Sequence, residues 1–285
     1  MAELALAKAA GDLRPSSDPE LAFTSQVFAV HPGLFGGAFA GEELLGIVSP
    51  EMKIVVVRPE FRRQGIGSRL VDMAVRMEIE RGRPELFLGS VPDDPGGAAF
   101  LQALRLTFHS TVWDLELPSD HVVPPPVWPD EVIARSFDPA RDVATLAAVV
   151  NAAFADHPTP MLMDEAMVRA SLDDPNLRDE DAIVLEDRAT GETVGFCLTD
   201  VHRESGVIVS RHGEIGIVGV RPDRQGRGLG RQLLRAGVGY LRGVGVAEIG
   251  LAVNGRNQGA LGLYESEGFV RNRTRDRWSR PVPSA

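Results

Sequence analysis

The chain has 285 residues and a formal net charge of −10, with 44% hydrophobic and 25% charged residues. This is the composition of a globular protein with a sizeable core, and its length predicts two domains of roughly 100–150 residues each. The negative charge argues against general binding to nucleic acid or anionic lipid, and no apolar run reaches the roughly 18–20 residues of a membrane span. The single cysteine excludes an intrachain disulfide. Together with the lack of a recognisable export signal, it predicts a cytoplasmic protein.

Two segments of the chain repeat each other without a gap. Residues 51–88 align with residues 214–251 at an offset of 163, and 13 of the 38 positions are identical. The identities include a Val-Arg-Pro sequence, two glycines and a glutamate, so we expect two copies of one β-turn-α arrangement. Residues 117–130 contain five prolines, which predicts a stiff linker. The predicted domains are residues 1–122 and 131–285, joined by a Pro-rich linker at 123–130.

The second half alternates strand and helix patterns in chain order. Asp138 is a plausible N-cap for the first helix. The first half follows the same pattern after its repeat, but it has a shorter segment before it. We therefore predict an α/β (α+β) fold in both halves, each a mixed central sheet flanked by helices. The expected elements are a strand at 132–137, helices at 138–155 and 164–172, a hairpin of 183–186 and 193–199, a strand at 214–220, a helix at 228–245, a strand at 248–253, a helix at 257–267 and a strand at 269–278.

A glycine-rich turn lies between the strand at 214–220 and the helix at 228–245. It reads Arg-Pro-Asp-Arg-Gln-Gly-Arg-Gly-Leu-Gly over residues 221–230. Its glycines leave successive backbone N–H groups unobstructed, and together with the helix N-terminus these form a site for phosphate oxygens. Arg227 and Arg231 can add charge-assisted contacts. The spacing does not fit a P-loop, because no lysine follows the glycines. It also does not fit a dinucleotide fingerprint, because no acidic residue stands at the expected distance.

The second half resembles the GNAT family of N-acetyltransferases. Residues 218–230, with Gln-x-x-Gly-x-Gly, and residues 257–269, with Leu-Tyr-Glu, carry this resemblance. It implies two tandem GNAT acyl-CoA N-acyltransferase folds, acetyl-CoA as co-substrate, and acetyl transfer to a primary amine of a small molecule by direct attack in a ternary complex. The implied cofactor-binding residues of the second half are Val218, Val220, Gln225, Gly226, Arg227, Gly228, Leu229, Gly230, Arg231 and Asn257. We also expect Asn257 to cap the helix that it opens.

Within the family, the tandem arrangement is most similar to the mycothiol synthases. That likeness implies an alternative acceptor, the cysteinyl amine of a glucosaminyl-inositol. Asp200 stands where the likeness leads us to expect a lysine, and Ala252 where we expect a tyrosine. A further alternative, from another functional class, is a non-catalytic acyl-CoA-binding regulatory module. We expect a monomer or homodimer with no nucleic acid or membrane partner.

Two residues are the implied catalytic groups. Tyr264 matches the family's general acid, although an aromatic residue that only packs a helix face in the core would give the same sequence pattern. Glu214 matches a carboxylate that deprotonates the amine directly or through water, although a solvated charge at a strand end would read the same way. His157 and Asp200 are candidates for substrate contact. We predict no metal, because His202 and His212 have no partner at metal-like spacing. Cys197 and Tyr240 are predicted to be core residues.

The first half retains the cofactor pattern but not the acid. At the offset of 163, Tyr264 falls on Leu101 and Asn257 falls on Asp94. We therefore predict that the N-terminal domain is a degenerate GNAT domain that binds coenzyme A without catalysing transfer. Its candidate cofactor-binding residues are Val55, Val57, Arg62, Arg63, Gly65 and Gly67.

Overall fold

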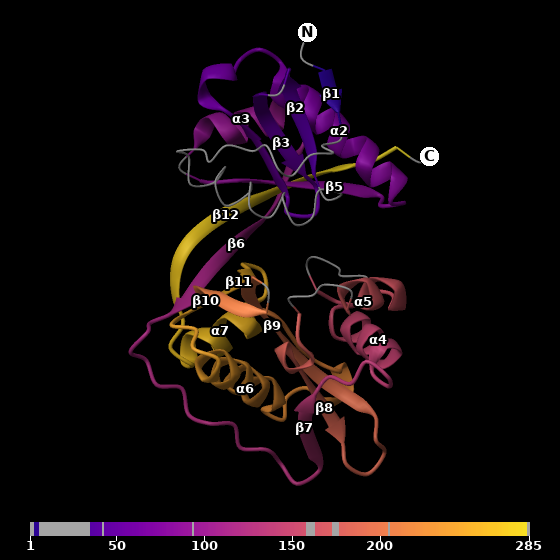
Figure 1. Cartoon of the computed structure of the whole chain (residues 1–285), viewed down its shortest axis with the longest axis vertical. Helices are drawn as coiled ribbons and strands as arrows, with labels where there is room; N and C mark the ends of the chain where they lie inside the picture. The colour runs from indigo at the N-terminus through magenta and orange to yellow at the C-terminus, as the bar shows by residue number, and fades with distance from the viewer. Residues whose placement is uncertain are drawn as a thin grey trace. The chain divides into compact units, whose positions relative to one another are not determined.

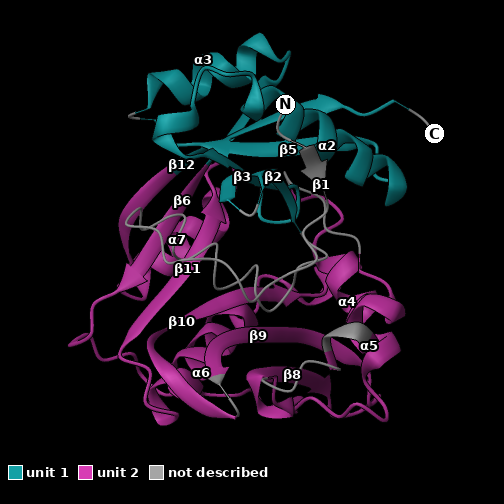
Figure 2. Ribbon diagram, turned by 45° about the horizontal axis from the view of Figure 1, so that its top comes forward, with its two compact units in different colours: residues 1–111, 275–285 teal, residues 112–274 magenta. Residues whose placement is uncertain are grey.

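The computed structural model describes residues 3–5, 35–41, 43–92, 94–157, 163–172, 177–204 and 206–283. It contains two compact units (Figure 2). Unit 1 comprises residues 1–111 and 275–285, and unit 2 comprises residues 112–274. Each unit combines sheet and helix, so the predicted α/β class is confirmed. The opening segment that we expected to be shortened in the first half falls on residues 6–34, outside the described residues.

Unit 1 has a four-stranded antiparallel sheet in the order β1-β2-β3-β4 and a further group of strands in the order β5-β12-β6. Helix α2 buries a stripe at helical spacing that includes Leu70, Ala74 and Met77, and this stripe packs against Ala38 and Val48. The elements of this part of the chain are β1 (Glu3–Ala5), β2 (Gly36–Ala40), β3 (Glu43–Ser49), β4 (Ile54–Val57), η2 (Pro59–Phe61), α2 (Ile66–Glu80), β5 (Glu85–Ser90), α3 (Pro95–Ala103) and β6 (Thr107–Leu117).

Unit 2 has strands in the order β6-β11-β10-β9-β8-β7, in which β10 and β11 are parallel and the other neighbouring pairs are antiparallel. One core packs α6 and α7 on the sheet, and a second packs α4 and α5. The elements, coloured by chain position in Figure 1, are β7 (Val132–Ser136), α4 (Val143–Ala153), α5 (Glu165–Leu172), η3 (Asp179–Asp181), β8 (Ala182–Asp187), β9 (Thr193–Glu204), β10 (Val207–Val220), η4 (Pro222–Arg224), α6 (Leu229–Gly243), β11 (Glu248–Asn254), α7 (Gln258–Ser266) and β12 (Val270–Pro281).

The offset of 163 holds for whole elements. Helix α2 becomes α6, α3 becomes α7 and η2 becomes η4, and both ends of each pair differ by the same 163 positions. The side chain that caps α3 is Asp94 and the one that caps α7 is Asn257, again at the same offset. The repeat inferred over residues 51–88 therefore continues through the next helix of each copy.

The final strands of the two copies take part in both units. Residues 112–117 of β6 pair with β11 inside unit 2. Residues 276–281 of β12 pair with β5 inside unit 1. Each copy of the repeat therefore supplies its last strand to the sheet of the other copy. This exchange is why the compact units do not coincide with the predicted domains 1–122 and 131–285.

The Pro-rich segment contains no helix or strand from residue 118 to residue 131, as its composition predicts. It belongs to unit 2 and is anchored on it. Val127 N–H donates to Gln232 Oε1 at 2.8 Å, and Trp128 packs against the α6–α7 core. The segment is therefore a packed strap of unit 2 rather than a free connection.

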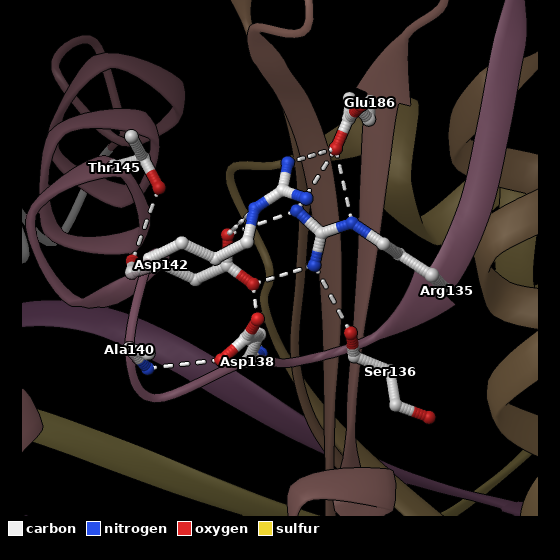
Figure 3. A network of polar contacts seen from close by, with 8 residues as sticks. Arg135, Ser136, Asp138, Ala140, Asp142, Thr145 and Glu186 are labelled. Atoms are coloured by element: carbon white, nitrogen blue, oxygen red, sulfur yellow. Dashed lines mark hydrogen bonds and ion pairs between the residues drawn. The ribbon is translucent and has the colours of Figure 1, made fainter.

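The first helix of unit 2 starts later than predicted (Figure 3). The prediction of Asp138 as N-cap is wrong, because α4 begins at Val143 and Asp142 is its N-cap. Asp138 Oδ1 instead accepts from Ala140 N–H at 2.9 Å, an Asx-type turn. Asp142 accepts from Arg135 at 2.5 and 2.9 Å, an ion pair that ties the start of α4 to β7.

Candidate active site

The glycine turn of unit 2 has the backbone that phosphate binding requires. Gly226 and Gly228 have φ angles of 75° and 78°, and a Cβ added at either would meet no atom within 4 Å. Gly228 is the N-cap of α6 and no side chain within the described part of the chain caps it, so the first N–H groups of the helix face the open turn. Gln225 Nε2 donates to the Val220 carbonyl at 2.9 Å and braces the loop. The turn therefore fits the pyrophosphate of an acyl-CoA.

Strand β10 leaves its parallel neighbour before it reaches this turn. In the described structure it pairs with β11 only over His212–Glu214, whereas its pairing with β9 continues to Val220. A bulge lies between Ile215 and Ile217, and bulges bend a strand and increase its twist. The edge of β10 that carries Val218 and Val220 is therefore available to an extended ligand chain, which suits a pantetheine arm.

Tyr264 lies on α7 inside the same core as the start of α6. Its side chain is 8% exposed and packs with Leu229, Val220 and Phe269. Burial raises the pKa of the Tyr264 phenol to about 12. No hydrogen bond to its hydroxyl is present among the described residues, and this hydroxyl is not among the fully buried atoms that lack a partner. The phenol therefore stays protonated at neutral pH, and its hydroxyl retains some solvent access.

Glu214 and Asp200 form a directly opposed pair on β10 and β9. The Glu214 side chain is 57% exposed, and its Oε1 lies 3.4 Å from His212 Nε2. This hydrogen bond raises the pKa of His212 above its ordinary value. The ring of His212 lies over Gly250, where a side chain would collide with it. The sheet thus places two carboxylates and one imidazole on one polar face.

His212 is a functional candidate that the sequence interpretation missed. Residues two apart on a strand point to the same face, so the His-x-Glu spacing was the available signal. The buried ion pair of Glu267 with Arg231 and Arg235 was also missed. Arg231, a predicted cofactor contact, has its guanidinium on Glu267 Oε1.

The remaining predicted residues of unit 2 have clear positions. Asn257 Oδ1 accepts from Ala260 N–H at 3.1 Å and caps α7, as predicted, while its contact with the cofactor stays a prediction. Leu229 is buried, so only its backbone N–H faces the turn. Arg227 is exposed beside it. The His157 ring packs on Phe154 with centroids 4.9 Å apart, and residues 158–162 lie outside the described residues.

The two predicted core residues differ in their surroundings. Cys197 is fully buried, and burial raises the pKa of its thiol to about 12, so the prediction of an inert core thiol is confirmed. Tyr240 is half-buried, but its hydroxyl donates to Asp181 Oδ1 at 2.7 Å. Arg203 donates to the same carboxylate at 2.6 and 2.7 Å, which gives a buried polar network behind β9.

Unit 1 repeats the turn without the site around it. Gly65 has φ 79°, and Arg63, which stands at the position of Gly226, has φ 64°. Arg62 Nε donates to the Val57 carbonyl at 2.9 Å, a hydrogen bond equivalent to that of Gln225 with the Val220 carbonyl in unit 2. The strand that carries Val55 and Val57 is β4. Gly67 approaches Phe100, so a side chain there would collide.

The hairpin of unit 1 is shorter than that of unit 2. Strands β3 and β4 join through a turn at residues 50–53, whereas β9 and β10 extend to 204 and from 207. Glu51, the counterpart of Glu214, therefore lies in a turn and pairs with Arg83 at 2.8 Å. The polar face that unit 2 carries on this hairpin has no counterpart at residues 50–53 of unit 1.

The glycine turn at the start of α6, the diverging strand pair and the buried phenol are features that an acyl-CoA-dependent transferase requires. The sequence comparisons specify the family. Residues 6–104 and 147–269 match the model of the Acetyltransferase (GNAT) family. The chain belongs to this family and is an acetyl-CoA-dependent N-acetyltransferase.

Curated relatives match most of the chain. A mycothiol acetyltransferase of Thermobispora bispora is 32% identical in an alignment of 283 positions that covers 95% of this chain and 92% of that relative. Another, of Salinispora arenicola, is 35% identical over 218 residues, 76% of this chain and 69% of that one.

Solved structures share the fold. A GCN5-related N-acetyltransferase from Sphaerobacter thermophilus aligns with a TM-score of 0.67 and 21% identity, over 91% of this chain and 86% of that one. A tandem GNAT protein from the clavulanic acid biosynthesis pathway aligns with a TM-score of 0.61 and 18% identity, over 88% of this chain and 83% of that one. The predicted tandem GNAT fold is confirmed.

The described residues contain neither a long apolar helix nor a cluster of metal-ligating side chains. None of the helices there is long and apolar enough to cross a membrane. In the same part of the chain, no group of three or more His, Cys, Asp or Glu side chains is arranged to hold a metal ion.

Proposed function

We propose that unit 2 transfers the acetyl group of acetyl-CoA directly to a primary amine of a small molecule, with Tyr264 as general acid and Glu214 as the group that receives the amine proton. The observation that carries this proposal is the buried Tyr264 phenol, whose hydroxyl has no hydrogen-bond partner among the described residues. A buried tyrosine hydroxyl normally finds a partner within the protein, so a ligand group is the natural partner here.

The proposed reaction needs acetyl-CoA, the amine and two side chains of unit 2, Glu214 and Tyr264. Acetyl-CoA supplies an activated thioester carbonyl. The amine nitrogen forms a bond to that carbonyl carbon and loses a proton to Glu214, directly or through water. The carbon–sulfur bond breaks, and Tyr264 gives its proton to the leaving sulfur. Direct attack is supported by Cys197, the one cysteine of the chain, because its thiol is buried and protonated and is not available as an acyl carrier.

The cofactor contacts follow from the same geometry. The N–H groups that start α6 and the turn residues Gly226 and Gly228 would hold the pyrophosphate, and the free edge of β10 would hold the pantetheine arm. Unit 1 keeps an equivalent turn, and we propose that it binds coenzyme A without catalysing transfer, since Leu101 replaces the phenol and the hairpin is cut short.

Two acceptors are favoured by different observations. The cysteinyl amine of a glucosaminyl-inositol is favoured by the similarity to mycothiol acetyltransferases, which extends over most of the chain. A cytoplasmic location of the protein agrees with this acceptor. Another small amine with a further positive charge is favoured by the opposed carboxylates Asp200 and Glu214. A cationic group offsets the repulsion between two like charges held across a strand pair.

The test is a thiol-release assay with acetyl-CoA and a panel of amines, including cysteinyl-glucosaminyl-inositol, glucosaminyl-inositol, cysteine and linear diamines. We expect one of these amines to release thiol far above the hydrolysis background and to gain one acetyl group by mass spectrometry. Acetyl-CoA binding without acceleration by any of them would favour a non-catalytic acyl-CoA-binding module and contradict the proposal.

A further inference from the structure

Helices α6 and α7 are joined by a buried charge cluster beside the proposed acid. Glu267 follows α7 directly, and its backbone N–H donates to the carbonyl of Tyr264 at 3.1 Å. Its carboxylate side chain is only 2% exposed. Arg235 donates to both of its oxygens, at 2.7 and 3.0 Å, and Arg231 donates to Oε1. These three residues are called the α6–α7 clamp below.

The clamp holds α7 on α6 at a cost in desolvation free energy. A buried carboxylate loses its hydration, and its ion pairs often stabilise the fold no more than apolar side chains of the same shape would. Glu267 also places a negative charge at the C-terminal end of α7, where the helix dipole disfavours it. Apolar contacts already hold α7, through Leu261 and Leu263 in the core. The clamp therefore defines the position of α7 relative to α6, rather than only strengthening the contact between the two helices.

Unit 1 supplies an internal comparison. Its α3 has the same length as α7 and packs on α2 as α7 packs on α6. At the offset of 163, Glu267 corresponds to Leu104, while the two arginines correspond to Ser68 and Asp72. The repeated helix thus docks without any member of the clamp. The copy that lacks the clamp is also the copy that has Leu101 in place of Tyr264.

The clamp links the phosphate turn at the start of α6 to the proposed acid on α7. Arg231 is the third residue of α6, the helix that begins at the phosphate turn. Glu267 lies three residues after Tyr264, less than one helical turn along. The two helices are in contact here, since a Cβ added at Gly230 would lie 3.9 Å from the Leu263 side chain. A shift of α7 along α6 would move the phenol relative to the turn, and the clamp opposes that shift.

We propose that Glu267, held by Arg235 and Arg231, is a positioning residue that fixes the Tyr264 hydroxyl relative to the cofactor turn. This rests on the proposed role of Tyr264. A misplacement of a catalytic group by about 1 Å can cost up to about 100-fold in rate. Loss of the clamp should therefore lower kcat while the affinity for acetyl-CoA changes little.

The experiment is a double-mutant cycle in the full-length protein, with acetyl-CoA and the best acceptor of the amine panel. Glu267→Leu copies Leu104 of unit 1. We expect it to lower kcat about tenfold and to change KM for acetyl-CoA less than about twofold. In a Tyr264→Phe background the same change should have little further effect, because the group it positions is gone. Glu267→Gln, which keeps the shape, should retain more activity than Glu267→Leu.

A matched control separates positioning from stability. Asp142→Asn disturbs another buried ion pair of unit 2, that with Arg135 on the α4 side (Figure 3), and its effect on kcat should be the same in both backgrounds. If Glu267→Leu unfolds the protein, Arg235→Gln is the second variant. An equal loss from Glu267→Leu with and without Tyr264 would overturn the clamp proposal alone. Full activity of Tyr264→Phe would instead overturn the role of the acid.

Discussion

Gly65 and Gly228 have the same backbone conformation, with φ 79° and 78°, at equivalent positions of the two repeats. Each is the N-cap of a 15-residue helix, and each follows a loop braced by one side chain on a strand carbonyl. The loop is thus the preserved part of the repeat. The acid and the hairpin that carries the polar face are the parts that differ, which is why we assign catalysis to unit 2.

The exchange of final strands predicts that the two halves of the chain depend on each other. A fragment of residues 123–285 lacks the β6 residues that pair with β11, and a fragment of residues 1–122 lacks the β12 residues that pair with β5. Each fragment alone should be poorly soluble, because it exposes a strand edge. The two fragments expressed together should co-purify and show acetyltransferase activity.

The comparison for this experiment is the same pair of fragments expressed separately. Circular dichroism and thermal unfolding of residues 123–285 alone give the decisive reading. A folded, monomeric fragment would mean that β12 can return to its own repeat, and the strand exchange would then be dispensable.

The pair of His212 and Glu214 predicts a specific titration. The pKa of His212 should lie above its ordinary value of about 6.5, because Glu214 accepts a hydrogen bond from the charged ring and Glu248 and Glu116 add to its potential. A raised pKa means that this interaction is fully present below the unfolded-state value and is lost as pH rises through the folded one. Glu214→Gln should lower the His212 pKa, as measured by NMR titration. The same pKa in both proteins would contradict the pairing.

The network of Asp181, Arg203 and Tyr240 predicts a large loss of stability on substitution. Asp181→Asn removes the charge partner of an arginine that is 5% exposed. The free energy of unfolding should fall by about 3 kcal/mol, because a buried arginine loses the carboxylate with which it forms its ion pair. Tyr240→Phe removes a neutral hydroxyl that donates to Asp181 and accepts from Arg203, and it should cost about 1.5 kcal/mol. Urea denaturation measures both.

A double substitution is the control for this network. Asp181→Leu combined with Arg203→Met replaces the ion pair by apolar groups, and it should recover much of the stability lost in Asp181→Asn. Equal destabilisation by Asp181→Asn and Tyr240→Phe would contradict the view that the buried charge dominates.

The repeated parts of the fold could be predicted from the sequence because their signals are local. The Val-Arg-Pro sequence, the two glycines and the helical stripe after them lie within about 40 residues and follow general rules for turns and amphipathic helices. The same rules placed Asn257 as a cap, and the structure confirms it. Tyr264 and Glu214 were found through the family resemblance, and their catalytic roles stay predictions.

Other features depend on contacts that sequence patterns do not encode. The strand exchange pairs residues 112–117 with residues 249–254, and either copy could have paired internally with the same alternation. The start of α4 differs from the prediction because Asp138 and Asp142 are both of a residue type favoured at an N-cap, and the contacts of Asp142 with Arg135 and with the Asp138 N–H are not encoded in that pattern. The hairpin of unit 2 is longer than predicted because residues 200–213 are mostly polar or glycine, a composition typical of a loop.

The most direct test of the account compares matched disruptions of the two repeats. Tyr264→Phe in unit 2 should lower kcat by about 100-fold or more, as expected for loss of a general acid, with acetyl-CoA still bound. Gly65→Asn in unit 1 adds a side chain to the equivalent turn while tolerating its positive φ, and should leave kcat within a small factor of the unaltered protein. Full activity of Tyr264→Phe, together with loss of activity in a folded Gly65→Asn variant, would contradict the assignment of catalysis to unit 2.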